Sequence, residues 1–414
     1  MIMITRVLLS ALAGLMAFVL SAHAQEFTFF VDKDSLAEDP TGLSWEDAFR
    51  MLQPAIDAAD AVVNTTTQPL QARADIWISE GIYDEERSWF RPDKPGPDLG
   101  ALSLASNVFL YGGFNGTEAT LDQRRIAENE TVITGVESLA GEPATSTIVA
   151  WEVTNSGLDG ITVDGQGVGS GSTIVLSEDI AFNQCRFEGI RGALGVSIAI
   201  GVGTGSSITV ENSQFLDNSR QGSGGAVGID GTATFTNCLF QDNSSSGAGG
   251  AIKVRGGGSA TIENCRFINN TGDTPSSGAW GGAVSSSGGD LVIKNSLFFG
   301  NFANRGAAIG HSGGFGGAQI TNCTFVANST DFNSIIFTED GGMAIENSIF
   351  WDNQGTLFGS NFSGIRATIK DNLIQGLSDM SVTGLPDRFM DHNIEADPLF
   401  VNAAKLDFRL QPMS

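Results

Sequence analysis

The chain has 414 residues, of which 22 are basic and 47 acidic, and its formal net charge is −25. Such an acidic surface repels nucleic acid and anionic lipid, so we expect neither as a partner. Its 53 glycines and its charged fraction of only 17% indicate many tight turns and few surface helices, which is typical of an elongated all-β chain.

Residues 1–24 have the pattern of a secretory signal peptide. Arg6 precedes an apolar run from Val7 to Leu20, and Ala22-His23-Ala24 supplies the small-x-small end. The run is shorter than the ~20 residues that a membrane span needs. We therefore expect a secreted or cell-surface bacterial protein whose mature chain has no transmembrane segment. Without Arg6 the mature chain has 21 basic and 47 acidic residues, a net charge of −26.

Residues 25–130 are expected to form an N-terminal cap and the first coils of a stack. Phe29 to Asp32 reads as a strand, and the stretch from Ser44 to Ala59 predicts an amphipathic helix with Ser44 as its N-cap. Further strands are predicted at 76–83 and 108–114. A helix in this place would cover the first strands, whose free edge would otherwise recruit other chains.

Residues 131–400 contain an internal repeat, which decides the fold class. Its first Asn recurs with steps of 25, 27, 31, 27 and 25 residues, at Asn212, Asn237, Asn264, Asn295, Asn322 and Asn347. A unit of this size cannot bury its own apolar face, so the units must stack. The repeat predicts an all-β chain folded as a right-handed parallel β-helix with an N-terminal capping helix.

Alternation within each unit predicts strands with defined faces. In the copy at 261–270 we expect Ile262, Asn264 and Phe267 to face inward, and Glu263 and Arg266 to face outward. The repeated Asn would then form a ladder along the stack. Its amide can donate and accept, and Asn tolerates the left-handed turn conformation, so each Asn is expected to satisfy the backbone of the next coil.

The four cysteines share one position of the repeat. Cys185, Cys238, Cys265 and Cys323 all follow the repeat Asn closely, where other copies have Ser213, Ser296 and Ser348. The position must therefore be small and interior. Stacking brings Cys238 and Cys265 within disulfide distance, but side chains stacked in a parallel sheet point the same way, so buried thiols are favoured over a bridge. The spacing of the cysteines does not predict a metal site.

A second motif precedes the strong copies. Gly-Gly-Ala followed by Val or Ile stands at 224–227, 249–252 and 281–284, with a degenerate copy at 306–309. Together with the following Phe-x-x-Asn, it resembles the repeats of chlamydial polymorphic outer membrane proteins and of many secreted bacterial β-helix proteins, over roughly residues 183–353. The N-terminal cap, and the segments 397–400 and 407–410 near the C-terminal closing segment (401–414), resemble pectate-lyase-like β-helices. This resemblance implies that a substrate would lie along one face of the stacked strands.

The strands after Gly-Gly-Ala place one basic pair on such a face. The predicted outward columns are Gly228, Lys253, Ser285 and Gly310, and Asp230, Arg255, Ser287 and Ser312. A polysaccharide lyase needs a base and a positive charge for the uronate carboxylate, supplied by Arg, Lys or Ca²⁺. Lys253 and Arg255 could fill these roles, and Ca²⁺ is possible although no acidic cluster stands nearby. Alternatively, Asp230 simply pairs with Arg255 on the next coil.

Other chemistry is less well supported by the sequence. Asp230 and Glu339 fall about four coils apart, ~19 Å at the spacing of sheet strands, too far for a pair of glycosidase carboxylates. His311 and His392 are interpreted as structural or merely exposed.

An apolar column after the repeat Phe could stack sugar rings or could be covered by a loop, and its members are Ile268, Phe299, Val326 and Trp351.

We predict a non-enzymatic scaffold for adhesion or glycan binding, with Lys253, Arg255, Asp230 and Trp351 as candidate ligand-binding residues. No cofactor is required by this interpretation. The alternative is a polysaccharide lyase acting on an acidic polysaccharide, with Lys253 and Arg255 as its catalytic residues.

Overall fold

The computed structural model describes residues 26–65, 72–85, 101–135, 146–165, 173–192, 200–272, 280–312, 317–339, 342–360, 366–379 and 390–411. The predicted signal peptide, residues 1–24, lies outside these ranges. No helix within them is long and apolar enough to cross a membrane.

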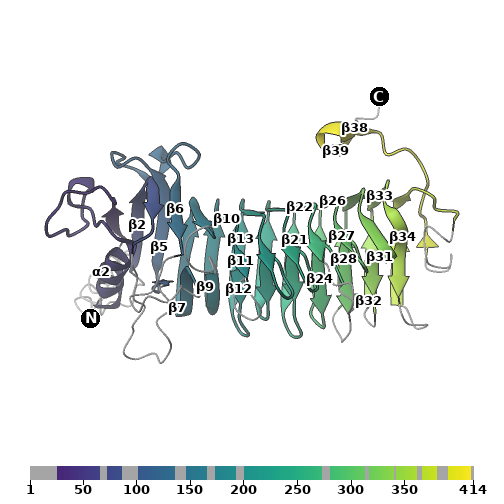
Figure 1. The fold of residues 1–414 in the computed structure, drawn as a ribbon, viewed down its shortest axis with the longest axis horizontal. Coiled ribbons are helices and arrows are strands. Elements are labelled where there is room, and N and C mark those ends of the chain that lie inside the picture. The colour runs from purple at the N-terminus through teal and green to yellow at the C-terminus, as the bar shows by residue number, and fades with distance from the viewer. Residues whose placement is uncertain are drawn as a thin grey trace, which may run out of the picture.

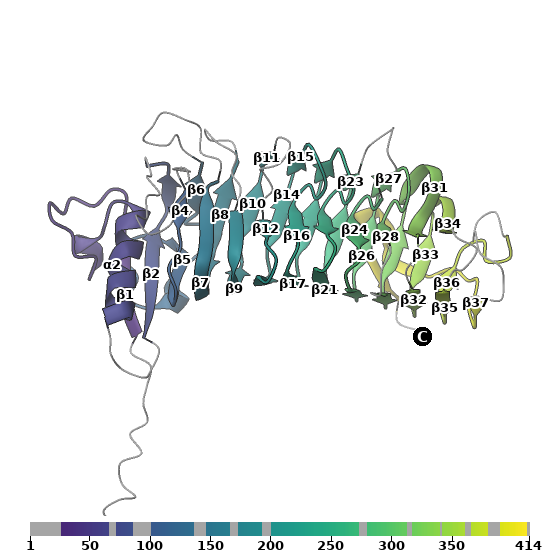
Figure 2. The ribbon, with the colours of Figure 1, turned by 90° about the horizontal axis from the view of Figure 1, so that it is seen from below.

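The chain forms an elongated stack of coils, with its N-terminal helix at one end (Figures 1 and 2). The larger of the two parallel sheets has 26 described strands. They are β1 (Glu26–Val31), β2 (Arg73–Ser79), β4 (Leu102–Ser103), β5 (Val108–Phe114), β7 (Ile148–Asp159), β9 (Thr173–Asn183), β11 (Arg191–Gly192), β12 (Ile200–Val202), β13 (Ser207–Glu211), β15 (Ser219–Arg220), β16 (Val227–Ile229), β17 (Thr232–Thr236), β19 (Ser244–Ser245), β20 (Ile252–Val254), β21 (Ser259–Glu263), β23 (Thr271–Gly272), β24 (Val284–Ser287), β25 (Leu291–Lys294), β27 (Phe302–Ala303), β28 (Ile309–Ser312), β29 (Ala318–Thr321), β31 (Ser329–Thr338), β32 (Gly342–Glu346), β34 (Gln354–Ser360), β35 (Arg366–Lys370) and β37 (Met390–Asp391).

The second sheet has 11 described strands, each made of two to four residues, and also pairs in parallel from coil to coil. They are β3 (Gly81–Tyr83), β6 (Thr131–Thr134), β8 (Ile161–Asp164), β10 (Arg186–Glu188), β14 (Gln214–Leu216), β18 (Leu239–Gln241), β22 (Arg266–Ile268), β26 (Leu297–Phe299), β30 (Thr324–Val326), β33 (Ile349–Trp351) and β36 (Leu373–Ile374). The predicted parallel β-helix is thus confirmed.

Stacked phenylalanines form the centre of the core. One Phe from each middle coil faces inward, and its ring stacks on that of the next coil with centroids 4.6 to 5.0 Å apart, through Phe187, Phe215, Phe240, Phe267, Phe298, Phe325 and Phe350. This spacing matches the separation of paired strands, so the repeat period places one ring on each coil.

In the copy at 261–270, Ile262, Phe267 and Arg266 lie on their predicted faces, whereas Asn264 does not. Ile262 and Phe267 are fully buried, and Arg266 is exposed. Asn264 is also exposed, and its φ of 54° places it in the left-handed turn that Asn tolerates. Because this turn reverses the parity of the strand, Cys265 faces inward instead. The prediction that Asn264 faces the core is therefore wrong.

A different Asn of the same motif satisfies the backbone. Asn270, the last residue of Phe-x-x-Asn, is fully buried. Its Oδ1 accepts from the backbone N–H of Asn243 at 3.1 Å, and its Nδ2 donates to the carbonyl of Phe240 at 2.9 Å. Equivalent bonds join the buried Asn of neighbouring coils, namely Asn218, Asn243, Asn301 and Asn328.

All four cysteines are buried free thiols, as the sequence predicts. Cys238 and Cys265 stack on adjacent coils, where the backbone N–H of Cys238 donates to the Sγ of Cys265 at 3.4 Å. Burial raises the pKa of the thiols of Cys185 and Cys323 to about 12.

The Gly-Gly-Ala motif is needed because neighbouring backbones pass too close for a side chain. The first glycine of the copy at 249–252, Gly249, has a φ of 74°. A Cβ on the second, Gly250, would lie 2.1 Å from the carbonyl oxygen of Gly282. The motif therefore fixes a turn and a close contact between coils rather than a ligand site.

The N-terminal helix α2 (Leu52–Thr65) covers the first strands, but it begins later than predicted. Ser44 instead precedes a short 3₁₀ helix, η1 (Trp45–Asp47), and makes no side-chain capping bond there. Ala48 is extended, which separates η1 from α2. The first helical N–H, that of Leu52, donates to Glu85 Oε1 at 3.0 Å, so a distant carboxylate takes the role expected of Ser44.

An antiparallel hairpin follows the stack, made of β38 (Phe400–Asn402) and β39 (Asp407–Leu410) and joined by the 3₁₀ helix η4 (Ala403–Lys405). The segment 397–400 leads into β38, and the segment 407–410 is β39. The hairpin folds back along the side of the stack (Figure 1). There the ring of Phe408 lies 5.5 Å from that of Phe299.

Candidate functional site

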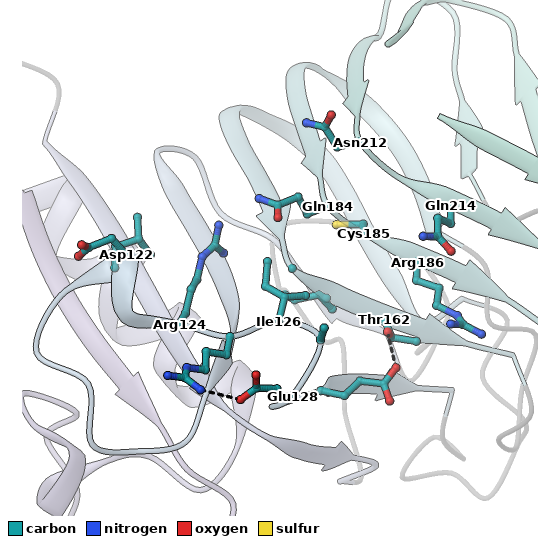
Figure 3. A pocket seen from close by; sticks show the side chains of 16 residues that line it. Asp122, Arg124, Ile126, Glu128, Thr162, Gln184, Cys185, Arg186, Asn212 and Gln214 are labelled. Carbon is teal, nitrogen blue, oxygen red and sulfur yellow. Dashed lines mark hydrogen bonds and ion pairs between the residues drawn. The ribbon is translucent and has the colours of Figure 1, made fainter. Parts of the chain in front are cut away.

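A cleft of about 890 Å³ opens beside the N-terminal coils (Figure 3). One wall is the segment 121–130, which starts with the 3₁₀ helix η2 (Leu121–Gln123). The other wall comes from the turns and first residues of β8, β10 and β14. It is lined by Gly160, Ile161, Thr162, Gln184, Cys185, Arg186, Asn212 and Gln214.

Three exposed amides give this second wall its polar character. Gln184 and Asn212 both occupy the left-handed turn before a strand of the second sheet, with a φ of 51° each. This turn holds their side chains outside the core, while Gln214 is the outward residue of β14. An amide offers both donors and an acceptor, so this wall can bind groups that themselves donate and accept.

A chain of hydrogen bonds holds the side chains of Asn212 and Arg124 in place at the cleft. Asn237 donates to Asn212 at 3.2 Å, Asn212 to Asn183 at 2.9 Å, and Asn183 to Asp159 at 2.9 Å. The other oxygen of Asp159 forms an ion pair with Arg124 at 2.7 Å. The side chains of Arg124 and Asp159 are 12% and 17% exposed, so this pair is better shielded than a surface pair and holds the guanidinium at the cleft.

The two other arginines of the cleft are also paired with carboxylates. Arg125 pairs with Glu128 at 2.9 Å, and Arg186 pairs with Glu188. Glu130 accepts a hydrogen bond from Thr162 at 2.9 Å. The cleft therefore presents hydrogen-bonding groups without a strong charge of one sign, which suits a neutral polyhydroxyl ligand.

A family model described as "Right handed beta helix region" matches residues 145–330 and 251–383, together more than half of the chain. The chain belongs to this β-helix family. Curated protein sequences give no match.

Two solved structures align with most of this chain at low similarity. A rhamnogalacturonan lyase is 12% identical with a TM-score of 0.43, covering 94% of this chain and 95% of its own. PfbA, a surface adhesin of Streptococcus pneumoniae, is 11% identical with a TM-score of 0.24, covering 85% of this chain and 93% of its own. Similarities this low do not transfer a function.

Lys253 lies in the predicted outward column of the β-helix, between Gly228 and Ser285 on the neighbouring coils. It does not project into solvent, because only 9% of the residue is exposed. Its stem lies beneath the turn at Gly224, where a Cβ would be 3.1 Å from that of Lys253. Its Nζ donates to Ser285 Oγ at 3.0 Å. Lys253 therefore lies in its predicted column, but it is covered and not open to a ligand as its predicted role requires.

Arg255 and Asp230 form the pair that the sequence offered as the alternative to a catalytic role. Arg255 Nη1 lies 2.9 Å from Asp230 Oδ2, and each side chain is 36% exposed. Burial and then the charge of Arg255 lower the pKa of the Lys253 ammonium to about 8. The three residues thus lie together on one face of this β-helix, and none of them lines the cleft.

The apolar outer column is largely covered. Ile268 and Val326 are each 5% exposed, and the C-terminal hairpin packs on Phe299 through Phe408. Trp351 at the end of the column is half-buried. Packing of the hairpin therefore accounts for the cover over Phe299 without a ligand.

The histidines and acidic groups that the structure describes do not form a metal site. His311 is fully buried, and His392 lies 3.6 Å from both Asp371 and Asp391 at the surface. Within the described ranges, no three His, Cys, Asp or Glu side chains gather closely enough to hold a metal ion. Within the described part of the chain, no such cluster therefore offers a site for the Ca²⁺ that the sequence left possible.

Sequence reasoning missed the cleft. Asn212 belongs to the repeat and was interpreted as purely structural, and nothing in the sequence joined it to the segment 121–130. The signal that could have been used is the position of Gln184, which replaces the repeat Asn in an early copy.

Proposed function

We propose that this β-helix is a secreted or cell-surface scaffold that binds a glycan in the N-terminal cleft, in an adhesive and non-enzymatic role. The observation that carries the proposal is the cleft wall formed by the exposed amides of Gln184, Asn212 and Gln214 beside the anchored guanidinium of Arg124. Sugar hydroxyls both donate and accept hydrogen bonds, and these groups complement them.

The charge of the chain favours a neutral glycan in this cleft. The mature chain has 21 basic and 47 acidic residues once Arg6 is removed, so its long-range field repels an anionic polymer. The arginines of the cleft keep donors available after pairing with carboxylates. The resemblance of the repeats to chlamydial polymorphic outer membrane proteins and the signal-like residues 1–24 support placement outside the inner membrane.

A polysaccharide lyase with Lys253 and Arg255 is the second candidate. The lowered pKa of Lys253, about 8, favours it because a base works best near the pH of its reaction. The burial of Lys253 and its hydrogen bond to Ser285 oppose it, since a substrate carbon could not approach the amine.

Glycan binding is tested by calorimetry with the full mature chain and neutral oligosaccharides such as xylo- and cello-oligomers. The double variant Gln184→Ala/Gln214→Ala should bind roughly tenfold or more weakly, because two hydrogen bonds are lost. Gln319→Ala, an exposed Gln on β29, is the matched control and should bind normally.

The proposal fails if the mature chain binds none of these oligosaccharides or if the cleft variant binds as well as the wild type. Release of unsaturated uronate from pectate or alginate, abolished by Lys253→Ala, would support the lyase instead.

A further inference from the structure

An apolar groove of about 460 Å³ lies at the N-terminal end of the stack and shares no lining residue with the cleft. It is formed by the segment before α2 and by the first turn of α2. Met51 in its lining is 44% exposed, and Leu36, which directly precedes the lining, is 89% exposed. Large apolar side chains gathered at a surface mark a site of contact with another molecule. We call this site the cap groove, and its apolar lining residues are Ala37, Pro40, Phe49, Met51 and Pro54.

The C-terminal hairpin has an apolar surface of its own that the stack does not cover. Leu399, Val401 and Leu410 are 57%, 43% and 54% exposed. The backbone N–H of Gln411 donates to the carbonyl of Leu399 at 2.9 Å, and Phe400 pairs with Leu410, so these bonds hold the three side chains on one small element. The hairpin thus shows solvent the kind of side chains that an apolar groove buries.

Leu399 is also held in an unfavourable backbone conformation. Its φ is 50°, in the left-handed region that a leucine rarely adopts. Because its side chain is exposed, packing within the chain does not offset this strain. Strain that the fold does not need is found where a segment binds another molecule. The conformation of Leu399 therefore supports a contact role for the exposed side of the hairpin.

The charges of the two surfaces are opposite. The cap segment, residues 26–65, has two basic and nine acidic residues, a net charge of −7. Among them, Glu38 and Asp39 are exposed lining residues of the cap groove. The hairpin has two basic residues and one acidic residue, a net charge of +1, and its Lys405 and Arg409 are both exposed. Opposite charges at the two surfaces favour their encounter and set its orientation.

The hairpin cannot reach the cap groove of its own copy. It packs on Phe299 of β26, and seven steps of the second sheet separate β26 from β3, the first strand of that sheet. At ~4.8 Å for each step, this separation is about 34 Å. The hairpin and the N-terminal cap accordingly lie toward opposite ends of the stack (Figure 1). A hairpin that fills the groove must come from a second copy.

We propose that the hairpin of one copy docks in the cap groove of a second copy, so that the chains associate head to tail. The exposed apolar side chains of the hairpin cover those of the groove, while Lys405 approaches Glu38 and Asp39. The contact uses two different surfaces, so each copy in a pair keeps one free groove or one free hairpin, and assembly continues as an open chain. This association does not depend on glycan binding in the cleft.

Sedimentation velocity of the full mature chain tests the association. The salt concentration is about 0.15 M, because repulsion between the acidic copies is then screened beyond ~8 Å. The protein is examined from about 1 to about 300 µM, since a small interface predicts an affinity in the micromolar range. The weight-average sedimentation coefficient should rise with concentration and should pass the value of a dimer.

One variant on each surface identifies the contact. Met51→Glu in the groove and Val401→Glu on the hairpin should each weaken self-association roughly tenfold or more, because a charge would be buried in the apolar contact. Phe332→Glu is the matched control: Phe332 is an exposed apolar residue of β31, and its replacement should leave association unchanged.

Mixing the two variants separates lost contact from lost folding. Met51→Glu keeps an intact hairpin and Val401→Glu keeps an intact groove, so an equimolar mixture should form dimers and stop there. A wild type that stays monomeric at every concentration overturns the proposal. So does a mixture that remains monomeric, or association that both variants leave unchanged.

A synthetic peptide of alternating leucine and lysine is the probe for a foreign partner. Calorimetry should show that the peptide competes with self-association of the wild type and does not bind Met51→Glu. If the wild type stays monomeric but binds this peptide through Met51, the groove takes a foreign basic segment and the second-copy proposal is refuted.

Discussion

The side-chain amide of Asn243 donates to the Oδ1 of Asn270 on the next coil at 2.9 Å, and both residues are fully buried. Each such Asn also binds a carbonyl of the preceding coil, as Asn270 does with Phe240 at 2.9 Å. The ladder thus joins three successive coils through every member. Buried hydrogen bonds of this kind are costly to leave unmade, which makes the ladder the first place to test the stack.

Replacing Asn270 by Ala should lower the free energy of unfolding by about 3 kcal/mol. The change leaves the buried N–H of Asn243 and the carbonyl of Phe240 without their partners. Urea unfolding followed by circular dichroism measures the effect. Asn264→Gly is the control, because Asn264 is exposed and Gly keeps its left-handed conformation. An equal decrease in the free energy of unfolding of the two variants would contradict the view that the buried Asn ladder stabilises the stack.

The four cysteines should be unreactive in the native protein. Cys185, Cys238, Cys265 and Cys323 are at most 2% exposed. Burial raises the pKa of the Cys185 and Cys323 thiols, and the hydrogen bond with Cys238 followed by burial raises that of Cys265, while the same hydrogen bond lowers the pKa of the Cys238 thiol. A thiol reagent must reach the thiolate, so burial alone keeps all four thiols from reacting. Labelling with a chromogenic disulfide reagent should give no signal until denaturant is added, and should then give four thiols per chain. Rapid native labelling, or fewer than four thiols after unfolding, would refute this arrangement.

Lys253 should make stability depend on pH in the alkaline range. Its pKa falls from 10.5 to about 8 on folding, so between these values the unfolded chain binds more protons than the folded one. Stability contributed by this group therefore rises with pH across that window, and the full cost of the buried charge is present below about pH 8. Across this pH window, the free energy of unfolding of the wild type should rise by up to about 3 kcal/mol relative to that of Lys253→Met.

The comparison is made by urea unfolding of both proteins at about pH 7 and about pH 10.5. Because other groups titrate equally in the two proteins, their contributions cancel in the difference. A difference that stays constant with pH would show that Lys253 keeps its ordinary pKa in the folded chain.

Phe408→Ala should loosen the C-terminal hairpin without unfolding the stack. The Phe408 ring packs on Phe299 and Phe400, with centroids 5.5 and 5.0 Å apart, and aromatic pairs contribute about 1 kcal/mol each. Limited proteolysis should cleave after residue 395 faster than in the wild type, while the coils stay resistant. Phe332→Ala is the control, since Phe332 is 81% exposed. Unchanged cleavage would mean that other contacts hold the hairpin.

The sequence by itself determined the stack, its register and much of its interior. The period fixed which residues recur on successive coils, so the Phe position, the shared Ser and Cys position and the pairing of Arg255 with Asp230 all followed from counting. Each coil pairs with the next through the same parallel hydrogen-bonding pattern. The recurring residues therefore reveal this pairing in the sequence alone.

Only the tertiary structure decided which Asn carries the hydrogen-bonded ladder, because a single left-handed residue at Asn264 reverses the face of everything after it. It also decided that Lys253 is covered, that Phe408 returns to Phe299, and that segment 121–130 faces Gln184 and Gln214 across a cleft. These contacts join residues outside the repeat or on different faces of it, and no period relates them. The proposed glycan-binding cleft depends on such non-repeating contacts.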